Sequence, residues 1–60
     1  MSRGRWLVLV EGVVVHASED CFVCAMRARR ESVPHGRAAL ARVGDASQLR
    51  AYEHGKEVPL

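Results

Sequence analysis

The sequence contains only two cysteines and no long apolar run. Two cysteines at C-x-x-C spacing are too few for the disulfide framework of a small secreted protein. The apolar stretch Trp6–Val15 is broken by Glu11 and Gly12 and is about half as long as the ~20 residues of a transmembrane helix. The chain begins with basic residues, as a secretion signal does, but no small-x-small cleavage site follows the apolar stretch. We therefore expect a cytoplasmic protein without a membrane segment.

Signatures of catalysis are also lacking. The sequence does not suggest a Ser-His-Asp catalytic triad. The five glycines are scattered at turns rather than gathered in a phosphate-binding loop. A chain of 60 residues would have to build a cleft and rigid surroundings for reactive groups from one small core. We expect a single non-enzymatic domain spanning residues 1–60, without a cofactor and with frayed ends at 1–4 and 59–60.

Lysine is nearly absent, because eight of the nine basic residues are arginine and Lys56 is the exception. The net charge of +2 includes no basic block, and no helix-turn-helix, zinc-finger or RNA-recognition signature is present. A nucleic-acid-binding module stays open as an alternative, provided that the fold gathers the candidate arginines on one side. These arginines are Arg27, Arg30, Arg37, Arg42 and Arg50.

The first half of the chain predicts a β-hairpin followed by a helix. The strands are Trp6–Val10 and Val13–Ala17, joined by a two-residue turn, with a bulged single strand as the alternative. Ser18 is the expected N-cap, and the two acidic residues after it would lie in the first helical turn. The helix should run from residue 19 to residue 30 or 31, and Pro34 and Gly36 should end it.

The second half predicts another hairpin. Its strands are Ala38–Val43 and Gln48–Glu53, joined by a turn at residues 44–47. A helix over residues 36–52 is the alternative, because this segment contains good helix formers. Lys56–Leu60 is read as a short edge strand or a tail. The predicted fold is α+β, in the order ββαββ, with one helix on one face of an antiparallel sheet.

The first strand is apolar on both faces. Trp6 and its alternate neighbours point to one side of the sheet, and Leu7 and Leu9 point to the other. One helix covers one face only, and strands that are buried on both faces have continuous apolar sequences. We expect a second copy of the chain to cover the other face, with Trp6, Leu7 and Leu9 as the self-association residues. The alternative is that Tyr52, Leu60 or the N-terminal residues fold over it.

The predicted helix has two different faces. A stripe of small residues would pack on the sheet, namely Cys21, Cys24, Ala25 and Ala28. The opposite face carries Val23, Met26, Arg27 and Arg30, either as a docking patch or as arginine stems that cover apolar surface. The predicted contacts with a macromolecular protein partner are Met26, Arg27, Arg30 and Arg37.

The C-x-x-C pair has three interpretations. As zinc ligands, Cys21 and Cys24 would need two more donors, and His16 and His35 are available. As a redox pair they would follow a strand at a helix N-terminus, but no Gly-Pro lies between them and the chain is short for a thioredoxin fold. The favoured interpretation is two small buried hydrophobic side chains, so no metal is predicted, and a zinc-stabilised domain stays an alternative.

Several features recur along the layout from Trp6 to Val58: a valine-rich strand pair, an S-E-D helix start, the following H-G, a strand ending in R-V and the segment AYEHGKEV. In this layout the chain resembles small phage-encoded anti-CRISPR inhibitors of type I systems. It implies a non-enzymatic inhibitor that docks on a host nucleoprotein complex without a cofactor. The slightly basic charge favours contact with an acidic protein surface or nucleic acid over mimicry of nucleic acid. No functional residue of that family can be assigned to a position in this sequence, because no family motif matches it position by position.

Overall fold

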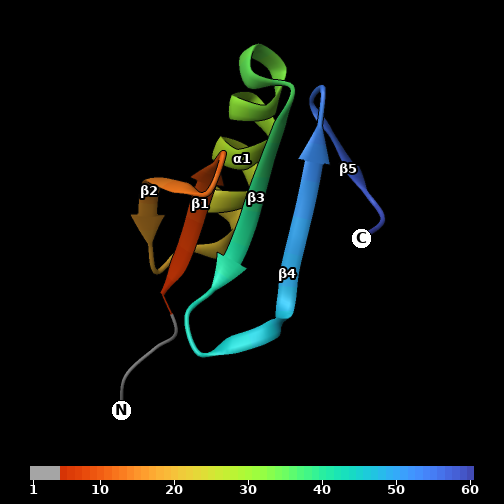
Figure 1. Cartoon of the computed structure of the whole chain (residues 1–60). Helices are drawn as coiled ribbons and strands as arrows, with labels where there is room; N and C mark the ends of the chain where they lie inside the picture. Colours follow the sequence, from red (N-terminus) through yellow and green to blue (C-terminus); the bar gives the residue numbers. More distant parts are fainter. Residues whose placement is uncertain (1–4) are drawn as a thin grey trace.

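A computed structural model describes residues 5–60 as one helix packed on one face of a five-stranded antiparallel sheet (Figure 1). The predicted α+β class is confirmed, and a fifth strand extends the predicted order. Residues 1–4, which were expected to be frayed, lie outside the described part. The elements in chain order are β1 (Trp6–Val10), β2 (Val13–Ser18), α1 (Cys21–His35), β3 (Arg37–Arg42), β4 (Asp45–Glu53) and β5 (Lys56–Val58).

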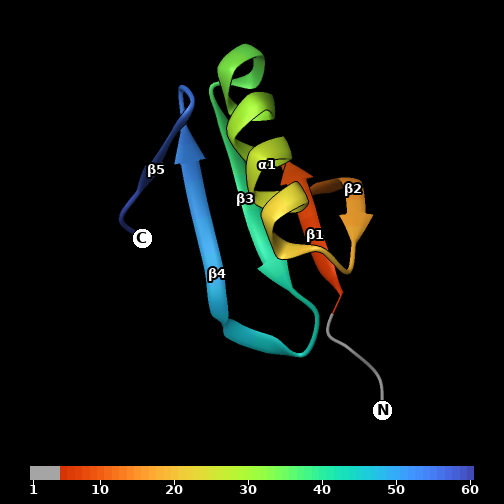
Figure 2. The same cartoon turned by 180° about the vertical axis from the view of Figure 1, so that it is seen from behind.

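The strands are arranged β2-β1-β3-β4-β5, so β3 is the central strand. The rotated view shows α1 lying across the same side of β1 and β3 (Figure 2). The predicted β1–β2 hairpin is confirmed, and its two turn residues have the positive φ angles of a type I′ turn, 53° at Glu11 and 79° at Gly12. The register shifts once, so that Val8 faces His16 while Leu9 faces Val14, which leaves Val15 as a bulge.

The helix begins later than the sequence suggested. Ser18 remains in β2, paired with Trp6, and the N-cap is Asp20, so no acidic residue lies in the first turn. Asp20 Oδ1 accepts hydrogen bonds from the backbone N–H groups of Phe22 (3.0 Å) and Val23 (3.3 Å). Ser18 Oγ instead accepts from the N–H of Asp20 (3.1 Å). The predicted N-cap was therefore wrong by two residues, because strand pairing holds Ser18 in the sheet.

The helix also ends later, at His35 rather than at residue 30 or 31. Pro34 lies inside the last turn, and only Gly36, with φ of 83°, ends the helix. The extra turn is held by the fully buried Ser32, whose Oγ donates to the carbonyl of Arg29 (2.7 Å) and accepts from the N–H of Gly55 (2.8 Å). This contact joins α1 to the β4–β5 turn. The residues around Ser32 in the sequence do not predict it.

The second half forms strands, so the helical alternative for residues 36–52 is wrong. β3 pairs with both β1 and β4, and burial of Ala38 and Leu40 against α1 explains why the strand outweighs local helix propensity. The expected turn at residues 44–47 is shorter, because Asp45 already pairs with Arg42 across it. Lys56–Val58 is an edge strand, confirming one of the two readings of this segment.

The core lies between α1 and one face of the sheet. Val8, Leu40 and Tyr52 supply its fully buried large side chains. The predicted stripe of small residues is confirmed, with Cys24 and Ala28 completely buried and Cys21 and Ala25 partly buried beside them. These small side chains let the helix approach the sheet closely.

The position of the N-cap can be tested by two neighbouring substitutions. Asp20→Ala removes both side-chain bonds to the helix N-terminus and is expected to lower the free energy of unfolding by about 1 kcal/mol. Glu19→Ala, at an exposed residue outside the helix, is the matched control and should change it by less than about 0.5 kcal/mol. Urea unfolding followed by circular dichroism measures both. An equal loss from the two variants would contradict the assignment of Asp20.

Candidate binding surfaces

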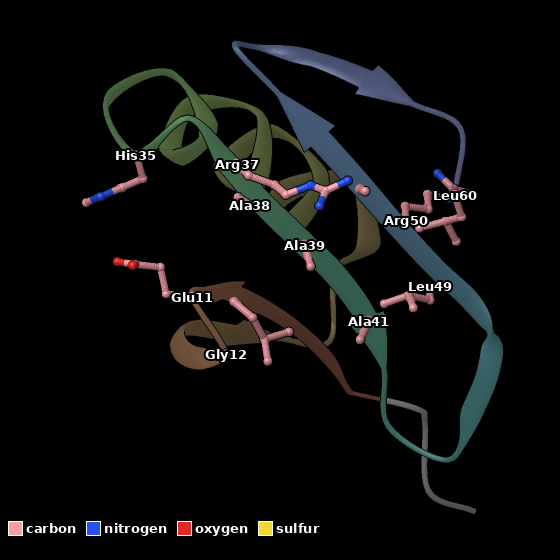
Figure 3. Close-up of a pocket in the computed structure, with 12 residues that line it drawn as sticks. Glu11, Gly12, His35, Arg37, Ala38, Ala39, Ala41, Leu49, Arg50 and Leu60 are labelled. Atoms are coloured by element: carbon pink, nitrogen blue, oxygen red, sulfur yellow. The ribbon is translucent and has the colours of Figure 1, made fainter.

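The face of the sheet opposite the helix forms a mainly apolar trough of about 590 Å³, with charged and polar side chains at one end (Figure 3). Burial along β1 alternates, with Trp6, Val8 and Val10 buried and Leu7 and Leu9 half-buried on the trough side. Trp6 is 8% exposed and belongs to the core, so its assignment to self-association is corrected. Leu7 and Leu9 do lie on the face that the helix leaves uncovered.

The trough is formed because small alanine side chains lie next to larger leucine side chains. Ala39 on β3 is paired with Leu9 on one side and with Ala51 on the other, so the two small side chains form a floor beside a larger one. Leu49 and Leu60 line the trough at β4 and at the C-terminal end (Figure 3). The structure therefore presents an apolar depression with raised leucine borders, a shape that the alternation in β1 alone did not reveal.

Tyr52 and Leu60, which were the alternative covers for this face, leave it open. Tyr52 is 1% exposed and lies in the core on the helix side. Leu60 lines the trough but is itself 80% exposed, so it covers little of the surface. The third suggested cover, residues 1–4, lies outside the described part of the chain.

Arg37 lies on the trough side, away from the other three predicted partner contacts. Its Nε is 3.1 Å from Glu53 Oε2, on the neighbouring strand β4. Glu11 and His35 also line this part of the trough (Figure 3). The predicted contact set is therefore divided between two surfaces, because the sequence did not show that the strand after α1 would turn this side chain to the opposite face.

The remaining predicted contacts come together in a hollow between α1 and β2, which we call the helix–β2 hollow. It has a volume of about 210 Å³ and is lined by His16, Val23, Met26, Arg27 and Arg30. Apart from the histidine, these are the residues expected on the outward helix face. The sequence did not predict that His16 lines this surface, and it indicated this residue as an alternative zinc ligand.

An ion pair beside the helix–β2 hollow orients one of its two guanidinium groups. Arg27 Nε lies 2.8 Å from Glu31 Oε2, one helical turn away. The hydrogen bond from Arg27 holds the pKa of Glu31 below its usual value, with smaller contributions from the charges of His35 and Arg30. No ion pair of Arg30 is found among residues 5–60. Arg30 thus keeps its charge available at the surface.

Three further arginines, Arg29, Arg42 and Arg50, lie outside the helix–β2 hollow. The guanidinium of Arg29 lies 5.9 Å from the centre of the Tyr52 ring, and that of Arg42 lies 5.7 Å from the Trp6 ring. Arg50 on β4 is paired with Leu40, which faces α1, whereas Arg37 lies on the trough side of the sheet. The five arginines considered for phosphate contacts therefore do not form one basic surface, which is the usual footprint of a nucleic-acid-binding protein.

The four possible zinc ligands are separated. Cys21 begins a helix of 15 residues and His35 ends it, a span of about 20 Å at the rise of an α-helix. No group of three or more metal-binding side chains occurs within residues 5–60. The arrangement proposed for Cys21, Cys24, His16 and His35 is therefore not formed, because the C-x-x-C pair lies in a continuous helix rather than in a turn.

Cys24 has the surroundings of a core residue rather than a reactive thiol. It is fully buried, with its Sγ 3.7 Å from the carbonyl oxygen of Trp6 and 3.9 Å from that of Ser18. Burial, followed by the neighbouring Cys21, raises the pKa of the Cys24 thiol, whereas a catalytic thiol has a lowered pKa. The geometry therefore favours a packing role for this cysteine.

Within residues 5–60, the helix–β2 hollow and the trough are thus two candidate surfaces for a partner. In the described range 5–60, no helix has the length and apolar character needed to cross a membrane. Comparisons with protein-family models, with curated proteins and with solved structures found no match for the chain.

Proposed function

We propose that this protein is a small non-enzymatic binding module that associates with itself through the open face of its sheet and binds a protein partner through the helix face. The observation that carries the proposal is the apolar trough, with its floor at Ala39 and Ala51 and its border at Leu9. An antiparallel sheet with one solvated face normally alternates apolar and polar residues along each strand. β1 does not, and the helix covers only one side of it.

A second copy of the chain is the occupant that best matches the shape of the trough. Its leucine borders and alanine floor lie side by side on neighbouring strands, so a two-fold axis can place Leu9 or Leu49 of one copy against the floor of the other. Two facing sheets pack about 10 Å apart with interdigitating side chains, as in a β-sandwich. The open face would then be buried at a symmetric interface.

Dimerisation in this way leaves the opposite side of each subunit free. Phe22, Val23 and Met26 are about half exposed or more on α1, beside Arg27 and Arg30. This mixture of apolar side chains and arginine is typical of the central residues of protein–protein interfaces. The resemblance to anti-CRISPR proteins implies an inhibitor role. In that role, the outward face of α1 would bind a host nucleoprotein complex and occlude part of its surface.

Self-association is tested by placing a charge on the floor of the trough. Ala39→Glu is expected to weaken the dimer at least about tenfold, because the interface would bury carboxylates without partners. The isolated subunit should keep its fold, since the new side chain faces solvent when no second copy is present. Sedimentation equilibrium over a range of concentrations gives the dissociation constant, and circular dichroism reports the fold.

Ala46→Glu is the matched control for this experiment. Ala46 is exposed near the start of β4 and does not line the trough, so the same substitution should leave the dissociation constant unchanged. A wild-type chain that stays monomeric at the highest concentrations would contradict self-association. A dimer that Ala39→Glu leaves intact would show that the second copy binds elsewhere.

A further inference from the structure

We infer that the helix–β2 hollow is a recognition site for a carboxylate side chain, an Asp or Glu of a partner protein that enters between α1 and β2. The inference deepens the proposed function by giving the chemistry of the residue recognised on the helix face. It rests on that function but concerns a different surface from the trough. The two can therefore fail independently.

The first observation is an unsatisfied polar atom in a residue that lines the hollow. His16 Nε2 is buried from solvent and has no hydrogen-bond partner among residues 5–60. Leaving a buried polar group without a partner costs about 1 to 3 kcal/mol, so such atoms are uncommon and call for an explanation. Met26, an unbranched and flexible side chain, lines the same hollow. The inference requires the side chains around His16 to rearrange when a carboxylate binds, so that its oxygen reaches Nε2.

The second observation is the charge around the hollow. Two of its five lining residues are arginines and none is acidic. Glu31 lies beside it and holds Arg27 in place through the 2.8 Å contact, while Arg30 has no ion pair in the described chain. A guanidinium fork matches the two oxygens of a carboxylate, and an imidazole N–H can donate a third hydrogen bond to them. The hollow is therefore complementary to an anionic group.

The surroundings favour a protein carboxylate over a nucleic-acid phosphate. Val23 and Met26 line the hollow, and Phe22 is 72% exposed on the same helix, so the charged centre adjoins apolar surface. A nucleic-acid strand would need further basic side chains along its path, but Arg37 lies on the trough side of the sheet and Arg42 lies over the Trp6 ring. A single anionic group beside apolar contacts is what an acidic residue in a protein interface provides.

The test is a nuclear magnetic resonance titration of the full labelled chain with sodium propionate, a carboxylate on a short apolar stem, at constant ionic strength. We expect saturable shifts of the His16 ring, the Met26 methyl and the Arg30 side chain, all with one dissociation constant. Arg30→Gln should weaken this binding about tenfold, because it removes the unpaired guanidinium. Arg5→Gln removes an exposed arginine outside the hollow and should leave the constant unchanged.

Two other results would overturn the inference. Shifts that do not saturate, or that Arg30→Gln and Arg5→Gln reduce equally, would mean that propionate associates with arginines in general. Dimethyl phosphate that binds the same residues more tightly than propionate would identify a phosphate site and a nucleic-acid partner. Either result leaves the self-association test untouched, since that test reads the oligomeric state through Ala39 in the trough.

Discussion

Leu40→Ala is expected to lower the free energy of unfolding by about 2 to 5 kcal/mol, which is the usual cost of a leucine-sized cavity in a core. Leu40 is completely buried on the central strand β3, between β1 and β4 and beneath α1. A chain of this length has a total stability of about 3 to 9 kcal/mol. The variant should therefore be largely unfolded at moderate temperature, with loss of the circular dichroism signal and exposure of Trp6 to solvent.

Leu49→Ala provides the matched control, because it makes the same substitution on the next strand. Leu49 is 42% exposed and lines the trough, so it loses little burial in a single subunit. Both variants are best compared in the Ala39→Glu background, where a dimer does not contribute to stability. We expect Leu49→Ala to cost less than about 1 kcal/mol there. Equal losses would mean that the trough side is as tightly packed as the helix side.

The sequence predicted well those features that depend on alternation along a strand. In β1, the opposite directions of Trp6 and Leu7 follow from strand geometry alone, and the structure puts the first in the core and the second on the open face. The stripe of Cys24 and Ala28 follows in the same way from the helical period. Such patterns are local, so they can be read without knowing the tertiary structure.

Features that depend on distant parts of the chain were not predictable. The last turn of α1 is held by Ser32, whose partner Gly55 lies 23 residues away. The N-cap moved to Asp20 because Ser18 pairs with Trp6 in the sheet. The bulge at Val15 is an irregularity of pairing, and it puts His16 opposite Val8, on the side of the sheet where the helix–β2 hollow lies. Each depends on tertiary contacts that outweigh local preference.

Each of the two proposed binding surfaces, the trough and the helix–β2 hollow, was also predictable only in part from the sequence. Leu7 and Leu9 were recognised as a surplus of apolar surface, but the alanine floor came to light only once β3 and β4 were aligned beside β1. The outward helix residues Met26 and Arg30 were identified from the helical period, whereas the histidine that completes their hollow comes from another element. A site built from two elements can be seen only in part from either sequence segment.

His16→Leu is expected to raise the free energy of unfolding by about 1 to 3 kcal/mol while abolishing the binding of propionate. The substitution removes the buried Nε2 that lacks a partner and introduces an apolar side chain of similar size at the position paired with Val8. Replacing an unsatisfied polar atom by an apolar one relieves its desolvation penalty. Urea unfolding gives the stability, and the propionate titration gives the binding.

His35→Leu is the control, because it makes the same change at an exposed imidazole. Nε2 of His35 lies 3.4 Å from Glu31 Oε1 at the end of α1, so its loss should lower stability slightly or leave it unchanged. A His16→Leu variant that is less stable than the wild type would mean that the ring contributes packing that leucine cannot replace. A variant that is more stable and still binds propionate would remove His16 from the recognition site. Higher stability together with lost binding would show that the free protein keeps an unfavourable buried atom which only an acidic partner satisfies.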